Sequence, residues 1–147
     1  MDNDVDILLV EDNPRDVELI MRALKKNNLA RRLAVVKDGE EALEFIFGTG
    51  RYAHRANAVL PQVMFLDLKL PKVSGIEVLQ QIRADARTKT LPIVVMTSAF
   101  QERDISAAYK LGANSYVVKP INFEQFTKTV VDLGNYWLAI NQAPMLR

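Results

Sequence analysis

The sequence predicts an α/β protein in which one parallel, five-stranded sheet carries helices on both faces. Five short apolar runs recur along the 147-residue chain, each of a length suited to a buried strand. A segment with apolar residues at helical spacing follows every run, and this alternation is typical of a doubly wound parallel sheet. Because the chain shows no internal repeat and no low-complexity stretch, we expect a single domain over residues 1–147, with its core at about 6–138 and no separate output domain.

The expected strands span residues 6–10, 34–36, 63–66, 91–96 and 115–118. The expected helices span residues 14–27, 40–47, 76–85, 102–111 and 123–141. After the first strand, Asn13 suits the N-cap of a helix and Pro14 its first turn. Apolar residues then recur at helical spacing from Val17 to Leu24. The second strand ends before Asp38-Gly39, which forms the turn into the second helix.

The stretch from Gly48 to Pro61 is less regular and reads as a long loop, with a helical turn around 52–55. Connections of this length in compact domains are often functional or mobile. The third strand starts at Val63, is apolar on both faces and delivers Asp67 at its end, before Pro71 stops it. A carboxylate is costly to bury without a partner, so we expect Asp67 at the carboxyl edge of the sheet.

Glycine and asparagine residues set the limits of the remaining helices. Ser74-Gly75 marks the loop before the third helix, and Gly112 stops the fourth. Asn122 is the expected N-cap of the long last helix, and residues 142–147 are expected to form a frayed tail.

Composition narrows the function. Lys and Arg number 19 against 18 Asp and Glu, a formal net charge of +1 that argues against direct nucleic-acid binding. The absence of cysteine excludes disulfides, thiolate zinc sites and a cysteine nucleophile. The acidic start and the short run after it do not fit a signal peptide, and no stretch approaches the roughly 20 apolar residues of a membrane span. We therefore expect a cytoplasmic protein.

Polar residues that could take part in a reaction lie at the ends of four of the strands. Glu11-Asp12, Asp67, Thr97 and Lys119 come directly after or at the end of apolar runs, and in a doubly wound parallel sheet these positions share one edge. Three carboxylates crowded together repel one another, which raises a pKa or favours uptake of a cation. With oxygen ligands and neither His nor Cys beside them, Mg²⁺ is the cation we expect.

This set of groups suits phosphoryl transfer to a carboxylate. The Lys119 ammonium and the Thr97 hydroxyl, together with a cation, would stabilise a phosphoryl group arriving at Asp67. Carboxylates act as nucleophiles when aspartyl phosphates form. Taken singly, each residue has a simpler explanation: Asp67 as a turn cap, Glu11-Asp12 as acids favoured at a helix N-terminus, and Lys119 as a solvated lysine.

The combination resembles the receiver domain of two-component response regulators. That family carries the same strand-end series, here in the order Glu11-Asp12, Asp67, Thr97 and Lys119-Pro120. The resemblance covers roughly residues 6–138. It implies the flavodoxin-like fold with strand order 2-1-3-4-5.

The resemblance also implies roles for the acidic residues. Asp67 is expected to be the phospho-acceptor and to become the aspartyl phosphate. Asp12 is expected to bind Mg²⁺ directly and Glu11 through water, while Asp67 and the backbone carbonyl of Lys69 complete the protein ligands. The acid pair is Glu-Asp where the family usually has Asp-Asp, which shifts the Glu11 carboxylate by one methylene.

Further roles concern the conformational switch. Thr97 is expected to turn toward the phosphoryl group and Lys119 to contact it, with the Lys119–Pro120 bond cis. Tyr116 takes the place of the aromatic switch residue, although a merely half-buried aromatic side chain explains it equally well. Gly75 matches the loop glycine of the family.

A narrower similarity concerns stand-alone regulators. The long segment from Gly48 to Pro61, Asn13-Pro14 after the acid pair and the long last helix are similar to features of the small regulators that accompany cyanobacterial and bacterial phytochromes. His54 is the single histidine and is expected to be exposed in a polar loop, so the chain offers no internal phospho-donor. The expected donor is a partner histidine kinase of the phytochrome type.

The sequence leaves two other functions open. One is an interaction module that keeps the fold without accepting phosphate. The other is a flavodoxin-like electron carrier, which the acid pair after the first strand disfavours because it would repel a flavin phosphate. In the leading interpretation the protein is not an enzyme but a phospho-acceptor that assists its own phosphorylation and dephosphorylation.

Aromatic residues also suggest self-association. Phe100 lies near the fourth helix, and the last helix carries many apolar residues, including Phe123, Tyr136 and Trp137. Aromatic residues are enriched in interface cores. We therefore expect a homodimer that uses the region of the fourth helix, fifth strand and fifth helix.

Overall fold

The computed structural model describes residues 4–29 and 32–145. Its sheet consists of five parallel strands in the order β2-β1-β3-β4-β5. The strands are β1 (Ile7–Val10), β2 (Leu33–Val36), β3 (Val63–Leu66), β4 (Ile93–Thr97) and β5 (Ser115–Val118). The predicted fold class and strand order are confirmed.

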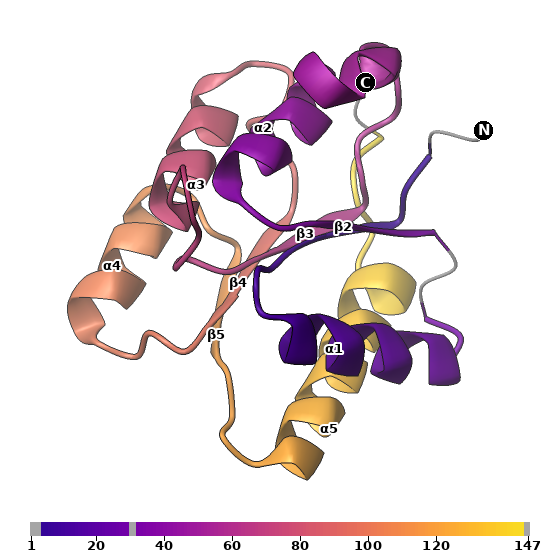
Figure 1. The fold of residues 1–147 in the computed structure, drawn as a ribbon, viewed down its shortest axis with the longest axis vertical. Helices are drawn as coiled ribbons and strands as arrows, with labels where there is room; N and C mark the ends of the chain where they lie inside the picture. The colour runs from indigo at the N-terminus through magenta and orange to yellow at the C-terminus, as the bar shows by residue number, and fades with distance from the viewer. Residues whose placement is uncertain (1–3, 30–31, 146–147) are drawn as a thin grey trace.

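Five α-helices cover the sheet: α1 (Pro14–Lys26), α2 (Gly39–Phe47), α3 (Gly75–Ala84), α4 (Glu102–Lys110) and α5 (Phe123–Gly134). Helices α1 and α5 pack together on one face, whereas α2, α3 and α4 lie on the other (Figure 1). The central strands β1, β3 and β4 are therefore buried on both sides, as their continuous apolar sequence predicts, whereas the edge strands β2 and β5 are partly exposed.

Strand residues alternate between two apolar clusters. Leu8 and Val10 of β1 join the cluster beneath α2 and α3, while Ile7 and Leu9 join the cluster beneath α1 and α5. All four side chains are at most 1% exposed. Because successive strand side chains point to opposite faces, one four-residue strand contributes to both halves of the core.

The helix starts follow the predicted capping pattern. Asn13 Oδ1 accepts hydrogen bonds from the backbone N–H groups of Arg15 at 2.9 Å and Asp16 at 3.3 Å. Asn122 Oδ1 accepts from Gln125 N–H at 3.0 Å at the start of α5. These side chains satisfy donors that have no partner within the helix.

The segment from Gly48 to Pro61 is more ordered than a loop. It contains a 3₁₀ helix, η1 (Gly50–Arg55), which packs against α2. Arg55 is only 4% exposed, and its guanidinium carbon lies 3.9 Å from the centroid of the Phe45 ring. His54 is exposed, as predicted.

The last helix turns from an α-helix into a π-helix before its predicted end at about residue 141. After α5, residues 135–140 form a π-helix, η2 (Asn135–Ile140), and regular helix stops there. The predicted frayed tail covers 142–147, of which 142–145 carry no regular secondary structure and 146–147 lie outside the described residues.

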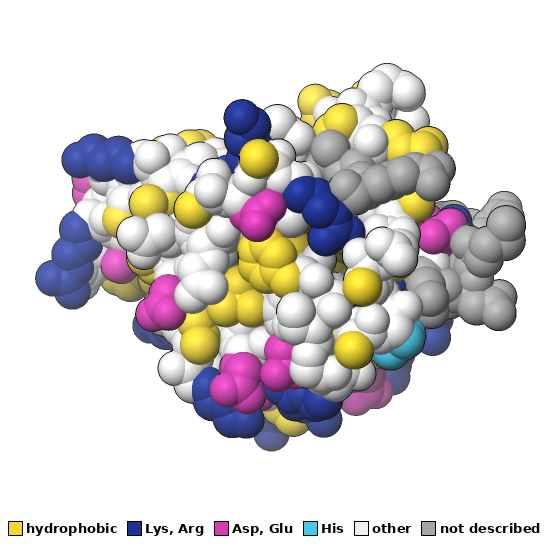
Figure 2. Space-filling model, turned by 90° about the horizontal axis from the view of Figure 1, so that it is seen from above, with side chains coloured by type: hydrophobic (Ala, Val, Ile, Leu, Met, Phe, Trp, Pro, Cys, Tyr) yellow, Lys and Arg dark blue, Asp and Glu magenta, His cyan; other side chains and the backbone are white. Residues whose placement is uncertain are grey.

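Charge is evenly mixed on the surface that Figure 2 displays, where acidic and basic side chains surround a central group of hydrophobic ones. Neither sign dominates that face, in line with the formal net charge of +1. Within the described ranges, no helix combines the length and apolar character that crossing a membrane requires.

Candidate functional site

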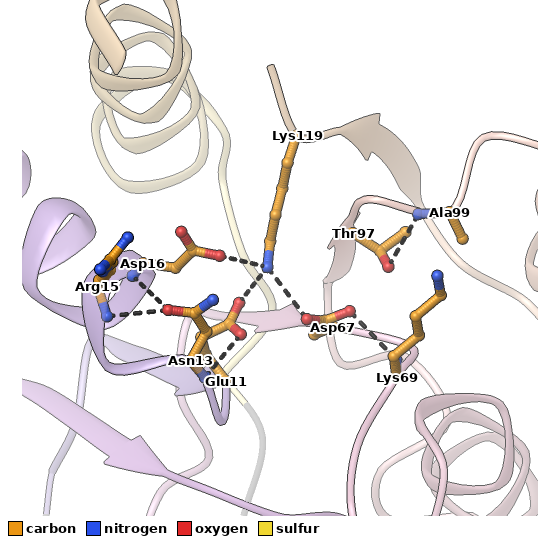
Figure 3. Close-up of polar contacts among 9 residues, drawn as sticks. All are labelled: Glu11, Asn13, Arg15, Asp16, Asp67, Lys69, Thr97, Ala99 and Lys119. Atoms are coloured by element: carbon orange, nitrogen blue, oxygen red, sulfur yellow. Dashed lines mark hydrogen bonds and ion pairs between the residues drawn. The ribbon is translucent and has the colours of Figure 1, made fainter. Parts of the chain in front are cut away.

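The carboxyl edge of the sheet brings together the polar residues that the sequence singles out. Glu11 and Asp12 follow β1, Asp67 follows β3, Thr97 ends β4 and Lys119 follows β5. In Figure 3 the Lys119 side chain extends from its strand toward the acidic residues, with Thr97 beyond Asp67. The predicted constellation is therefore contiguous in space.

Lys119 lies at the centre of the polar contacts. Its ammonium donates hydrogen bonds to Glu11 Oε1 at 2.6 Å, Asp16 Oδ2 at 2.9 Å and Asp67 Oδ2 at 3.1 Å. Its side chain is only 10% exposed, so these ion pairs are shielded from water and stronger than surface pairs. The charge on Asp67 is thus directly compensated by a lysine.

Three carboxylates form a candidate cation site. One oxygen each from Glu11, Asp12 and Asp67 lies within 4.8 Å of the others. Glu11 and Asp67 are buried, at 2% and 7% exposure, whereas Asp12 is exposed. An all-oxygen donor set with one solvent-facing member fits a hard divalent cation that keeps part of its water shell.

Burial gives Glu11 and Lys119 unusual protonation behaviour. Burial raises the pKa of Glu11 to about 7, a rise to which the nearby Asp67 charge adds and which the hydrogen bond from Lys119 opposes. Burial by itself would lower the pKa of Lys119, but hydrogen bonds to Asp16 and Glu11 outweigh it and the pKa is raised. Lys119 therefore stays charged, while burial disfavours the ionised form of Glu11.

Thr97 and Tyr116 both bind Ala99. The buried Thr97 Oγ1 accepts a long hydrogen bond from Ala99 N–H at 3.4 Å. The Tyr116 hydroxyl donates to the Ala99 carbonyl at 2.9 Å. The two predicted switch residues thus contact the same residue, at the start of the connection from β4 to α4.

The backbone after β3 holds Asp67 in place. The Lys69 backbone N–H donates to Asp67 Oδ1 at 3.2 Å, and Gly75 N–H donates to the Leu68 carbonyl at 2.9 Å. A Cβ at Gly75 would lie 2.3 Å from the Asp67 carbonyl oxygen. A glycine is therefore required where α3 begins against this strand end. The role of the Lys69 backbone carbonyl as a metal ligand remains a prediction.

The peptide bond after Lys119 differs from the prediction. No cis peptide bond occurs within residues 4–29 and 32–145, so Lys119–Pro120 is trans and the predicted cis form is wrong for this structure. The trans form of such a bond is favoured by about 0.5–1 kcal/mol. The Lys119 N–H still reaches the Thr97 carbonyl at 2.8 Å, so the strand pairing that places Lys119 does not need the cis form.

Asp16 is the site residue that sequence reasoning missed. It lies in the first turn of α1, where an acid is explained by the helix dipole alone. Nothing in that turn marks Asp16 for contact with a lysine 103 positions later in the chain.

Comparison with known proteins agrees with this geometry. Residues 7–131 match the family described as the response regulator receiver domain. The chain belongs to this family. Its acid pair, central aspartate, threonine and lysine are the residues on which the resemblance was predicted.

Two curated relatives match most of the chain. The probable methanogenesis regulatory protein FilR2 of Methanothrix harundinacea is 40% identical over 138 residues, which are 94% of this chain and 86% of FilR2. Response regulator Rcp1 of Synechocystis is 36% identical over 132 residues, 90% of this chain and 88% of Rcp1.

Solved structures of cyanobacterial response regulators are also similar. The Mn²⁺-bound form of Rcp1 has a TM-score of 0.88 at 35% identity and covers 95% of this chain and 99% of its own. The phosphorylated cyanobacterial phytochrome response regulator RcpA has a TM-score of 0.88 at 37% identity, over 96% and 99% of the two chains. The predicted similarity to phytochrome-associated regulators is confirmed.

Proposed function

We propose that this receiver domain accepts a phosphoryl group on Asp67 from a histidine kinase, in the presence of Mg²⁺, and signals by a change of conformation. The observation that carries the proposal is the placement of Asp67 between a lysine and an acid pair. Asp67 Oδ2 lies 3.1 Å from the Lys119 ammonium, and Asp67 belongs to the oxygen trio with Glu11 and Asp12.

In the proposed reaction, a carboxylate oxygen of Asp67 attacks the phosphorus of a phosphohistidine. The new O–P bond forms as the P–N bond breaks, and the imidazole leaves with the electron pair and takes up a proton. The Lys119 ammonium donates to a phosphoryl oxygen and stabilises its charge. When bound to Glu11, Asp12 and Asp67, Mg²⁺ would supply further neutralisation of negative charge.

The phosphohistidine is proposed to come from another protein, a phytochrome-type kinase in the cytoplasm. The single histidine of the chain, His54, lies in η1 and is not one of the residues at the carboxyl ends of the strands. Support for the phytochrome link comes from the similarity to Rcp1 and to the phosphorylated RcpA, a phytochrome response regulator.

The proposed readout involves Thr97 and Tyr116. A phosphoryl group on Asp67 offers an acceptor to the Thr97 hydroxyl. If this hydroxyl turns toward it, the Ala99 N–H loses its present acceptor. The populations of two arrangements of the β4–α4 connection would then shift, which a partner protein reads.

We also propose a symmetric homodimer at the edge formed by α4, β5 and α5. Strand β5 is the last of the sheet, and no strand of the described residues pairs with its outer edge. Beside it, Phe100, Tyr109 and Val118 are 71%, 50% and 41% exposed. A second copy would cover both the edge and these side chains, and sedimentation of the phosphorylated and unphosphorylated protein tests this: a monomer in both states would contradict it.

The central test uses a small phosphodonor such as acetyl phosphate, followed by intact mass. The wild type should gain one phosphate with Mg²⁺ and little without it, and Asp67→Asn should gain none. A wild type that gains no phosphate would favour the alternative, an interaction module with this fold. Equal labelling of Asp67→Asn would show that the acceptor is another residue.

A further inference from the structure

The hydrogen bonds of Lys119 fill its donor capacity. An ammonium group has three N–H donors, and those of Lys119 meet Glu11 at 2.6 Å, Asp16 at 2.9 Å and Asp67 at 3.1 Å. Any further acceptor, such as a phosphoryl oxygen, must therefore replace one of these carboxylates.

Two of the three carboxylates have a second role. Glu11 and Asp67 belong to the oxygen trio that fits a divalent cation, whereas Asp16 does not. A cation that attracts the Glu11 and Asp67 oxygens competes with Lys119 for them. Since Lys119 is only 10% exposed, water would replace these partners poorly, and a buried ammonium without partners is costly.

Asp16 is well placed to be the remaining partner. Its backbone N–H is bound by the Asn13 cap at 3.3 Å, so its position in the first turn of α1 is fixed. Its side chain is 22% exposed and turns toward the sheet edge, as Figure 3 shows. The next acid of the helix, Glu18, is instead 69% exposed and pairs with Arg22 at 2.6 Å.

We propose that Asp16 is a positioning residue, whose carboxylate holds the Lys119 ammonium at the phosphoryl-accepting edge while Glu11 and Asp67 serve the cation and the phosphoryl group. Its effect on metal affinity follows from the contacts around Lys119. Its effect on phosphorylation rests on the proposed function.

The first test is metal affinity. Mn²⁺ is titrated into the full chain, and the free ion is measured by its electron paramagnetic resonance signal. Asp16→Asn should raise the Kd roughly tenfold, the equivalent of one lost charge-assisted hydrogen bond, because Lys119 then competes for Glu11 and Asp67 without an alternative partner.

Glu18→Gln is the matched control. It removes the same charge from the same helix, but the described ion pair of Glu18 is with Arg22 and not with Lys119. It should therefore change the Kd by less than about twofold, as expected for an exposed charge. Equal Kd values for Asp16→Asn and Glu18→Gln would overturn the proposal. The Mn²⁺ Kd of Asp16→Ser is measured as well, so that the result does not depend on the asparagine variant alone. Circular dichroism of all variants shows whether each is folded.

The second test asks whether Asp16 acts through Lys119. In a Lys119→Met background there is no ammonium to hold, so adding Asp16→Asn should change the Mn²⁺ Kd no more than adding Glu18→Gln does. A tenfold effect that persists in this background would mean that Asp16 attracts the cation directly, and would overturn the positioning role.

The third test separates this proposal from the proposed function. With acetyl phosphate at saturating Mg²⁺, the maximal labelling rate of Asp16→Asn should be about tenfold below that of Glu18→Gln, because a misplaced catalytic contact slows the step even when the metal is bound. If the wild type is labelled and the two variants have equal labelling rates, the positioning role in phosphorylation is overturned. Unlabelled wild type would instead overturn the proposed function, and the metal-affinity test would stand by itself.

Discussion

Lys119 and Arg55 are two shielded cations among the described residues, and they are held in different ways. Lys119, at the carboxyl edge of the sheet, is surrounded by Glu11, Asp16 and Asp67. Arg55, in η1, is 4% exposed and packs its guanidinium 3.9 Å from the centroid of Phe45.

The difference separates a cation that is proposed to take part in phosphoryl transfer from one that packs on an aromatic ring. The partners of Lys119 are carboxylates, whose charge a divalent ion or a phosphoryl group alters. Arg55 packs on an aromatic face and donates from Nε to the Phe45 backbone carbonyl at 3.5 Å, and the contact between its charge and the ring contributes about 0.5–2 kcal/mol. A buried cation is therefore informative about function only once its partners are known.

Replacing Lys119 should have the largest effect. Lys119→Met removes the donor proposed to stabilise the incoming phosphoryl group, and should slow labelling by acetyl phosphate at least about a hundredfold, as expected for loss of one preorganised donor. The same change removes the competitor for Glu11 and Asp67, so the Mn²⁺ Kd should fall. Stopped labelling together with a higher Kd would show a general collapse of the site instead.

Acidification should have the next largest effect, and it acts on the Lys119 side of the comparison alone. Burial, with the charge of Asp67 beside it, raises the pKa of Glu11 to about 7 from 4.5. Below that pH a cation must displace the Glu11 proton, so Mn²⁺ affinity should fall by up to about tenfold per pH unit below 7 and level off above it. Glu11→Gln should bind more weakly and lose this dependence.

Glu11 should make the free energy of unfolding depend on pH in the opposite direction to an ordinary salt-bridged acid. Because the folded-state pKa of Glu11 lies above its ordinary value of 4.5, the folded state holds the proton more tightly than the unfolded chain does. The stability contribution of Glu11 in metal-free protein is therefore present below pH 4.5 and lost as the pH rises through about 7. Urea unfolding in the presence of a chelator measures it, with Glu11→Gln as the control.

Replacing Arg55 should affect stability and leave the chemistry unchanged. Arg55→Met keeps much of the apolar stem and removes the charge from the ring of Phe45, so the free energy of unfolding should fall by about 1–2 kcal/mol. The labelling rate and the Mn²⁺ Kd should stay within about twofold of the wild type, as expected for a distant, independent site. A change in Kd as large as that of Lys119→Met would erase the distinction between the two cations.

The smallest effect is expected on β5, the strand that precedes Lys119, at a residue outside the contacts of Lys119. Tyr116→Phe removes the hydrogen bond to the Ala99 carbonyl and should cost about 1 kcal/mol of unfolding free energy. Because Tyr116 does not contact the ammonium among the described hydrogen bonds, Mn²⁺ affinity should be unchanged. A shifted Kd would extend the Lys119 network to Tyr116.

Sequence patterns predicted the fold well because each strand is apolar on both faces and each helix has a clear start. The position of Asp67 followed from the cost of burying a carboxylate, and its neighbours from the common edge of parallel strands. Asn13 and Asn122 could be assigned as caps because capping is a local interaction.

Other features depend on contacts between distant segments and had no local signal. Asp16 is separated by 103 positions from Lys119, and nothing in its own turn shows that a lysine will meet it. The burial of Arg55 depends on the ring of Phe45, ten positions earlier. The π-helix after Gly134 was not indicated by the pattern of residue types, and the trans bond before Pro120 is the intrinsically favoured form, which only the family resemblance argued against.

Ala99 lies between the fully buried Thr97 hydroxyl, which it contacts, and the exposed residue Phe100. Its N–H is bound by Thr97, which is 0% exposed, and its carbonyl by Tyr116, while the next residue, Phe100, is 71% exposed. In a monomer, a fluorophore or a fluorinated aromatic residue at position 100 would therefore sit in solvent, next to the residue whose N–H binds the hydroxyl proposed to sense the phosphoryl group. In the proposed dimer the same position would report on association, and neither use changes a residue at the carboxyl edge of the sheet.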